Sequence, residues 1–495
     1  MSERIKNYQI ILSHCLIDLL IDHEYEEIDS RLILANTQRQ FSENNIWMAN
    51  DKIDLLRVYF QFSNNTIILI KGSYLFIRMA KFWFLLCLLL PSIAFSYEFP
   101  PERTVREADK ELGWMFAPLP GCVEGVGCAV PIAGLISNFY ESTDLVLIKT
   151  LAKGDIEATV VQLQKFPIID ERVFFKVLYY DWDISLLNYD RGIHSGKNDY
   201  YQTFENTNNS TINLQSQFYN QHLEIQIGYS TGEAKISKIF DNDENQFSNI
   251  QSPSRTWIDH TIGTQIDLTD NHLEPREGIR FELLHNATNY GLSELSDYDV
   301  NSLNLTTYIP FLGSDTLLIN AFQSRSYISE HGLTDENTLS NKFGLGCDLE
   351  IQADACRDAE KRRTNYWLKR NRFGKASALG GINRMRAYSQ GRFYAGNSSN
   401  YVLEYRHNFS EKQTPINWII MGGVRTVLQA SFFYELGSVS DDISELHKNM
   451  RTSFGAGFRA IISGLIYRFD IAKGDDGIAP TLFINYPLSL GTLGS

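Results

Sequence analysis

Residues 379–409 read LGGINRMRAYSQGRFYAGNSSNYVLEYRHNF, and the two halves of this stretch have different physics. The first half is rich in glycine and arginine. Its paired glycines, Gly380 and Gly381, permit positive φ angles and close backbone approach, which indicates a loop. The second half alternates from Tyr401 to Phe409, with mainly apolar residues at odd positions and polar residues at even positions. This period of two predicts a strand with one apolar and one polar face.

The rest of the chain repeats this alternation. It predicts strands at residues 136–151, 155–166, 172–186, 221–230, 257–267, 278–286, 298–310, 315–327, 424–436, 453–462, 465–472 and 481–490. Residues 190–209 are polar and predict at most one weak strand. Short turns join some strands, whereas long loops rich in Asn, Ser and Asp, such as residues 240–254, join others, an asymmetry typical of outer-membrane barrels.

Charged residues gather on the polar faces of the C-terminal strands. They are Glu404, Arg406, Arg425, Glu435, Arg459, Arg468 and Asp470. In a soluble sandwich this face would lie outside, whereas in a barrel it lines the lumen. Closing the sheet removes its edges and satisfies the backbone in lipid. The pattern therefore predicts an all-β fold, a transmembrane antiparallel β-barrel; a secreted β-rich globular protein is the alternative.

Composition agrees with a barrel. The 495 residues include 25 Tyr and 30 Phe but only 13 Pro, and 43% are hydrophobic. Many aromatic residues with a mean hydropathy of −0.22 suit a wall that is apolar outside and polar inside. The formal net charge of −14 argues against nucleic acid as a partner.

A targeting segment divides the chain. Residues 79–96 combine a Met, a Lys, a short apolar core and an Ala-x-Ser end, which is typical of a secretory signal peptide with Tyr97 as the first mature residue. An internal signal anchor is the alternative. We expect residues 1–78 to be a non-translated or disordered extension, 97–132 a short periplasmic segment, and 133–495 the barrel.

Four cysteines of the mature chain form two close pairs, Cys122/Cys128 and Cys347/Cys356. An exported chain meets an oxidising compartment, which favours two local disulfides. A zinc site is the competitor, but the spacing is wrong and no histidine cluster lies nearby. The second pair falls in an insert, residues 344–375, whose segment 361–373, KRRTNYWLKRNRF, is expected to be helical. It is interpreted as a solvated loop element, with a basic patch for an acidic partner as the alternative.

Five motifs carry a family resemblance. LGGINRMRAYSQGRF with YVLEYRHNF resembles the sixth-loop motif of the BamA/TamA outer-membrane superfamily, the bacterial surface antigen family. FFYELGSV at 432–439, SFGAGFRA at 453–460 and LIYRFDIAKG at 465–474 resemble its following strands. DLTDN at 267–271, with Pro275 and Gly278, is similar to its D-x-x-DN turn.

The resemblance implies a sixteen-stranded barrel whose sixth extracellular loop folds into the lumen, in a short branch that has the barrel alone and no POTRA domains. The motif residues of this loop are Gly380, Gly381, Arg386, Tyr388 and Gly391. Arg386 is expected to pair with Glu404 and Glu435, since an arginine in the lumen needs a carboxylate. Arg406, Arg468 and Asp470 are further lumen charges. The alternative is that Arg386 points to solvent while Arg406 or Arg425 pairs with the acids.

Two functions remain open at this stage. One is a bacterial outer-membrane protein related to assembly or translocation factors, with membrane lipid and unfolded outer-membrane or secreted proteins as partners. The other is a passive pore or structural barrel without assembly activity. An enzyme such as a lipid hydrolase is not expected, because His260, His285 and His407 are isolated and no G-x-S-x-G motif occurs. No cofactor or metal is expected.

Overall fold

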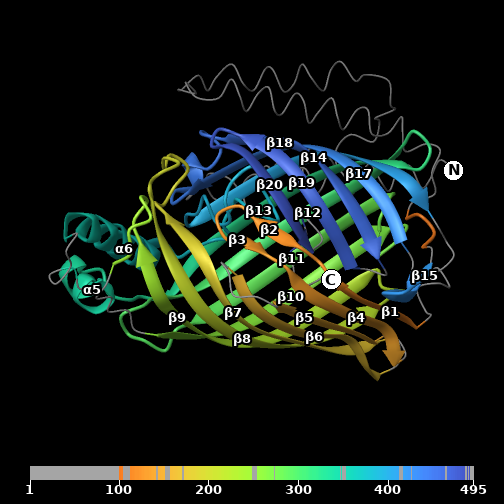
Figure 1. Cartoon of the computed structure of the whole chain (residues 1–495), viewed down its shortest axis with the longest axis horizontal. Coiled ribbons are helices and arrows are strands. Elements are labelled where there is room, and N and C mark those ends of the chain that lie inside the picture. The colour runs from red at the N-terminus through yellow and green to blue at the C-terminus, as the bar shows by residue number, and fades with distance from the viewer. Residues whose placement is uncertain are drawn as a thin grey trace, which may run out of the picture. The chain divides into compact units, whose positions relative to one another are not determined.

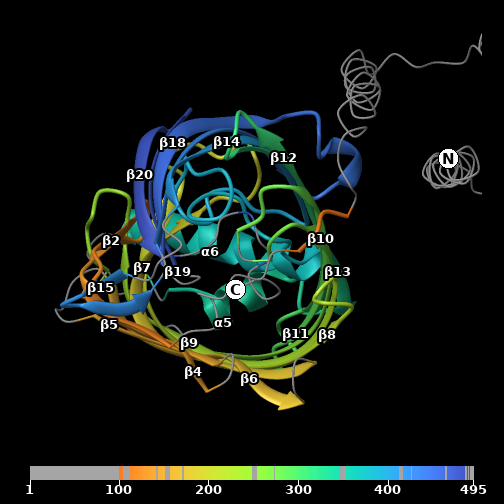
Figure 2. The same cartoon turned by 90° about the vertical axis from the view of Figure 1, so that its right-hand side faces the viewer.

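The described strands form one antiparallel sheet that curves into a ring (Figure 2). The computed structural model describes residues 100–103, 112–140, 143–150, 156–169, 172–247, 254–272, 274–345, 347, 353–411, 416–424, 426–462, 465–484, 488 and 490. Neighbouring strands in the sequence pair with each other around most of the ring, as in an up-and-down barrel. The expected signal peptide at 79–96 and the extension at 1–78 lie outside the described residues.

The first ten strands run from the N-terminal side of the sheet to its middle. They are β1 (Gly113–Pro118), β2 (Gly121–Val123), β3 (Gly127–Ala129), β4 (Pro131–Tyr140), β5 (Thr143–Thr150), β6 (Ile156–Ile169), β7 (Val173–Tyr189), β8 (Tyr200–Phe218), β9 (Leu223–Phe240) and β10 (Arg255–Thr269). Successive strands from β4 to β10 pair antiparallel, and β1 pairs with β4.

Ten more strands follow along the sheet. They are β11 (Gly278–Asn289), β12 (Asp297–Phe311), β13 (Asp315–Glu330), β14 (Asn397–Glu411), β15 (Ile416–Trp418), β16 (Met421–Val424), β17 (Thr426–Ser440), β18 (Arg451–Ile462), β19 (Leu465–Gly474) and β20 (Gly477–Ile484). β14 pairs with β17, so the short hairpin β15–β16 stands outside this order.

Side-chain burial is inverted relative to a soluble protein. On β9, Glu224 and Gln226 are fully buried, whereas Ile225 and Ile227 face outward, and Ile227 is 58% exposed. The same holds on β17, where Glu435 is buried and Phe432 is exposed. A polar interior behind an apolar outer face is the pattern of a transmembrane barrel. The antiparallel β-barrel fold expected from the alternation is confirmed.

The two ends of the ring differ. Short turns such as residues 312–314 join strands at one end, while the connection between β13 and β14 at the other end spans residues 331–396. That connection carries α5 (Glu336–Phe343) and α6 (Ala353–Phe373), which lie together at one end of the sheet (Figure 1). A short 3₁₀ helix, η3 (Ile443–Glu445), lies in the connection between β17 and β18.

None of the described helices is both long and apolar enough to cross a membrane.

Two strand expectations were wrong. The single strand expected at residues 136–151 is two strands, β4 and β5, which pair with each other across a tight turn. Residues 190–209 contain much of the long strand β8, which continues to Phe218. The segment from Tyr200 to Asn209 carries polar residues on both faces, so no apolar alternation marks it.

The sheet also begins earlier than expected. The barrel was expected to begin at residue 133, after a short periplasmic segment, yet β1, β2 and β3 lie between residues 113 and 129. β1 pairs with β4 from Gly113 opposite Ser137 to Pro118 opposite Ile132, so part of the segment 97–132 belongs to the sheet. Pairing partners supplied by distant strands outweigh the local preference of Gly and Pro for turns. The strand count of sixteen stays a prediction.

Candidate functional site

The loop that precedes β14 folds back on itself inside the ring. Leu379 and Phe393 form an isolated backbone bridge, and the Gly380 N–H donates to the Arg384 carbonyl at 3.0 Å. Gly380 has a φ of +107°, and a Cβ there would lie 2.3 Å from the Ser389 carbonyl oxygen. The loop therefore requires glycine at this position.

Apolar side chains of this loop pack against the inner wall. Met385, Tyr388 and Phe393 are buried in one cluster with Phe322 of β13 and Phe433 of β17. This packing holds the loop in the lumen and places the Arg386 side chain between two strands.

Arg386 is fully buried and binds two carboxylates. Its Nε donates to Glu435 Oε1 at 3.0 Å and its Nη2 donates to Glu404 Oε2 at 3.0 Å. Its backbone N–H also donates to Glu435 Oε2 at 2.7 Å. The guanidinium lies over the Phe433 ring, 3.4 Å from its centroid. All three charged side chains have no exposed surface, so their charges are compensated within the protein.

Further charges surround this core. Glu404 accepts a hydrogen bond from Arg406 Nε at 2.7 Å, and its Oε1 lies 2.9 Å from Arg459 Nη2. Asp470 binds Arg468 and lies 3.8 Å from Arg386 Nη1. Arg386 and Arg406 therefore both contact Glu404, and Arg386 is buried instead of pointing to solvent. Arg425 lies outside the described residues.

The rest of the motif anchors the loop to neighbouring strands. The Tyr388 hydroxyl donates to the Thr452 carbonyl at 2.9 Å. Arg392 donates to Asp476 at 2.7 Å and to the Ser195 hydroxyl at 2.6 Å. Gly391 has a φ of +71°, which favours glycine at this turn. The arrangement works as a plug that is pinned to several strands by charge-assisted hydrogen bonds.

A second charged cluster was missed by the sequence interpretation. Asp267, in the D-x-x-DN motif, accepts from Arg280 at 2.9 Å and from the Thr269 hydroxyl at 2.6 Å. Arg103, which precedes β1, lies 3.4 Å from the same carboxylate. Asp270 accepts from the backbone N–H of residue 276 at 2.8 Å, so the motif caps its own turn. The partner Arg103 is distant in sequence, and no local signal could have indicated it.

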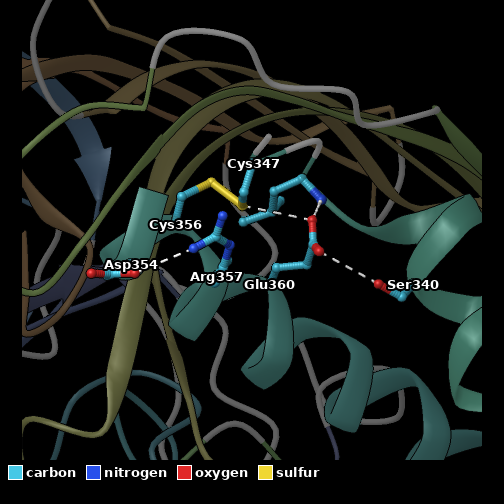
Figure 3. The surroundings of a disulfide bond; sticks show 7 residues. Ser340, Cys347, Asp354, Cys356, Arg357 and Glu360 are labelled. Carbon is cyan, nitrogen blue, oxygen red and sulfur yellow. Dashed lines mark hydrogen bonds and ion pairs between the residues drawn. A yellow bond between two sulfur atoms is a disulfide. The ribbon is translucent and has the colours of Figure 1, made fainter. Parts of the chain in front are cut away.

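The helical insert caps the end of the ring that carries the long loops. Cys347 and Cys356 are bonded and buried against Ile236 and Ile239 of β9. Glu360 accepts from the Leu345 N–H at 2.6 Å, beside the disulfide (Figure 3). The disulfide and the carboxylate tie Cys347 and Leu345 to α6, and the apolar cluster packs this part of the insert against β9.

The basic residues of α6 are used for packing. Arg363 is buried and donates to the Phe343 carbonyl at 2.5 Å. Arg370 lies over the rings of Tyr290 and Trp367, and burial, with nearby arginines, lowers its pKa to about 9. Burial and the neighbouring Arg370 charge also lower the pKa of Lys375 to about 8. These contacts favour a structural role for the insert over a basic patch for an acidic partner.

Replacing Cys347 and Cys356 together by serine should loosen this cap. Closing so short a loop stabilises it by about 2–3 kcal/mol. We expect trypsin to cleave α6 faster in the double variant, while the barrel keeps its heat-modifiable migration on a gel. Asp354→Ser, an exposed position on the same helix, is the matched control. Equal cleavage of the three proteins would show that the disulfide does not hold the cap.

The N-terminal and C-terminal strands of the sheet meet at a seam between β2 and β20. β20 is paired with β19 along its whole length. On its other edge, the described residues give one backbone pair, Cys122 opposite Leu482, which comes from β2. Cys122 is itself bonded to Cys128 across the β2–β3 hairpin. The Tyr467 hydroxyl adds a bond to the Pro120 carbonyl at 2.7 Å. The seam is thus the weakest junction in the described part of the ring.

The other edge of β1 has a different partner. β1 pairs with β16, with Trp114 opposite Gly422 and Met115 opposite Met421. Beyond β20, Leu488 is buried in the lumen, where its carbonyl accepts from Asn304 at 2.8 Å. Leu488 therefore lies inside the ring, and β16 lies beside β1.

Comparisons with known proteins add little to this geometry. No family model and no curated protein matches the sequence. Among solved structures, BamA from Haemophilus ducreyi lacking POTRA domains 1–3 is similar over 76% of this chain and 69% of its own, at 11% identity and a TM-score of 0.41. BamA belongs to the superfamily that the sequence motifs resemble.

CdiB is also similar. The Acinetobacter baumannii protein matches 75% of this chain and 59% of its own, at 10% identity and a TM-score of 0.41. The Escherichia coli protein matches 75% and 62%, at 10% identity and a TM-score of 0.43. This chain therefore spans about three fifths of the two CdiB chains.

Proposed function

We propose that this chain is a bacterial outer-membrane barrel that assembles or translocates other polypeptides through its seam. The observation that carries the proposal is the weak junction of β20 with β2, beside a β1 edge that pairs with a strand from elsewhere in the chain. A strand edge that accepts one segment offers the same backbone donors and acceptors to another.

The location in the membrane follows from the burial pattern. Large apolar side chains such as Ile227, Phe432 and Phe458 are exposed on the outer face and suit contact with lipid. In lipid, an incoming strand must satisfy its backbone groups, and the β1 edge supplies hydrogen bonds for that purpose. The substrates that we propose for the chain are unfolded outer-membrane or secreted proteins.

The lumen plug supports a role other than a wide pore. Arg386, Tyr388 and Phe393 of the inward-folded loop are buried inside the ring. The loop forms ion pairs with Glu404 of β14, Glu435 of β17 and Asp470 of β19, which would hold these three strands together during a change at the seam. The competing function is a passive pore or structural barrel without assembly activity.

Depletion separates the two functions. If the chain assembles other barrels, a survey of the outer membrane after its depletion should show several unrelated barrel proteins reduced together. If it is a pore, the membrane proteome should stay constant, and the purified protein should give steady ion conductance in planar bilayers. An unchanged proteome would contradict the assembly proposal.

Topology provides a further prediction. Asn242 is exposed in the loop between β9 and β10, and Ser314 is exposed in the turn at the opposite end. Asn242→Cys should be labelled in intact cells by a membrane-impermeant maleimide, whereas Ser314→Cys should be labelled only after lysis. The reverse pattern would contradict the orientation with the long loops outside.

A further inference from the structure

The β15–β16 hairpin, residues 416–424, lies at the end of the sheet opposite α5 and α6, next to β1 (Figure 1). It belongs to the connection between β14 and β17, yet its partner strand is β1, about 300 residues earlier in the chain. We call it the 416–424 hairpin. Its reach to β1 places it across the seam.

Apolar packing ties the 416–424 hairpin to both sides of the seam. Ile420 and Met421 pack in one cluster with Met115 of β1 and with Ile462 and Ile484 of the C-terminal strands. The cluster therefore links β1, the hairpin and the last described strands. The hairpin therefore covers the seam, although it is not one of the successive paired strands of the ring.

Glycines allow the hairpin to lie this close. Gly423 has a φ of +67°, and a Cβ there would lie 2.2 Å from the Leu112 carbonyl oxygen. A Cβ on Gly422 would lie 2.5 Å from Trp114 Nε1. The Phe116 N–H donates to the Ile420 carbonyl at 2.9 Å, so the ladder extends to the hairpin turn. The close approach at the two glycines and the backbone hydrogen bonds together make the β1 edge a binding site for one strand.

We propose that the 416–424 hairpin is a resident latch, which occupies the β1 edge and must leave before an incoming strand can pair there. The inference rests on the proposed function and names its regulation. One edge holds one strand, because each N–H and C=O on that side bonds a single neighbour. The segment that displaces the hairpin is an extended polypeptide with a glycine opposite Trp114 and an apolar residue opposite Met115.

The first test asks whether the latch is docked in the folded protein. Met115 and Met421 face each other across the ladder, at a distance that a disulfide can span. In isolated membranes, the full chain with Met115→Cys and Met421→Cys should cross-link in most molecules upon oxidation. The control pair Met115→Cys and Ile419→Cys should give only background, since Ile419 is 86% exposed at the turn. Background for both pairs would overturn the inference.

The second test asks whether another strand competes. The probe is the synthetic peptide INWIIMGGV, the sequence of residues 416–424. Excess peptide should lower the Met115/Met421 cross-link several-fold in the otherwise unchanged protein, and a scrambled peptide should not. A peptide with Cys at the Met421 position should link to Met115→Cys several-fold more in a Gly423→Val chain, and Ile419→Ser is the control. A cross-link that is insensitive to peptide would overturn the latch.

Failure of the latch and failure of the proposed function give different results. If the cross-link resists peptide while depletion still reduces other barrels, the assembly function stands and the latch is wrong. If peptide displaces the hairpin but depletion leaves the membrane proteome constant, the docking competition stands and the assembly function is wrong. Loss of barrel assembly upon oxidation of the Met115→Cys/Met421→Cys pair, with recovery upon reduction, supports both.

Discussion

Arg386→Ala should destabilise the barrel by about 3–5 kcal/mol, the cost of removing one partner from a buried charge pair. The substitution leaves Glu404 and Glu435 buried without the guanidinium that bridges them, and it removes the contact with the Phe433 ring. The midpoint of urea unfolding, followed by heat-modifiable migration on a gel, should fall accordingly. Arg386→Lys should recover only part of the loss. A lysine ammonium lacks the planar, forked guanidinium that donates to both carboxylates at once.

Arg372 offers a matched control. It is an exposed arginine near the end of α6, and its replacement by alanine should change stability by less than about 0.5 kcal/mol. If Arg386→Ala unfolds at the same urea concentration as Arg372→Ala, the loop does not hold the barrel together.

The strands near the C-terminus were predictable because the wall imposes a local rule. Where one face meets lipid and the other the lumen, every second residue must be apolar, as in β14 around Glu404. The rule also places Glu435 and Arg468 on the inner face, where the structure has them. It fails for β8, which carries polar residues on both faces, and for the short strands β1 to β3.

Contacts between distant segments could not be predicted in this way. Three features depend on which segments the ring brings together: the pairing of β16 with β1, the bond of Arg103 to Asp267 and the burial of Leu488. Alternation reports the environment of a residue but carries no information on its partner. Arg386 was an exception only because its motif resembles a known family.

Glu404→Gln should be as damaging as Arg386→Ala, because one carboxylate faces three guanidinium groups. Glu404 binds Arg386 at 3.0 Å and Arg406 at 2.7 Å, and it lies 2.9 Å from Arg459. Glutamine keeps the shape but removes the charge, so excess positive charge is left in a buried site. We expect a loss of about 3–5 kcal/mol in the same urea assay.

A double variant tests the electrostatic cause. If excess positive charge is what destabilises Glu404→Gln, then adding Arg406→Gln should restore part of the stability, although Arg406→Gln alone destabilises. When two residues share a hydrogen-bond or ion-pair network, the stability change of the double variant differs from the sum of the single changes by about 0.5–3 kcal/mol. High salt should help little, since the site is buried and screened weakly. Strictly additive losses would mean that packing, and not charge balance around Glu404, holds the loop in the lumen.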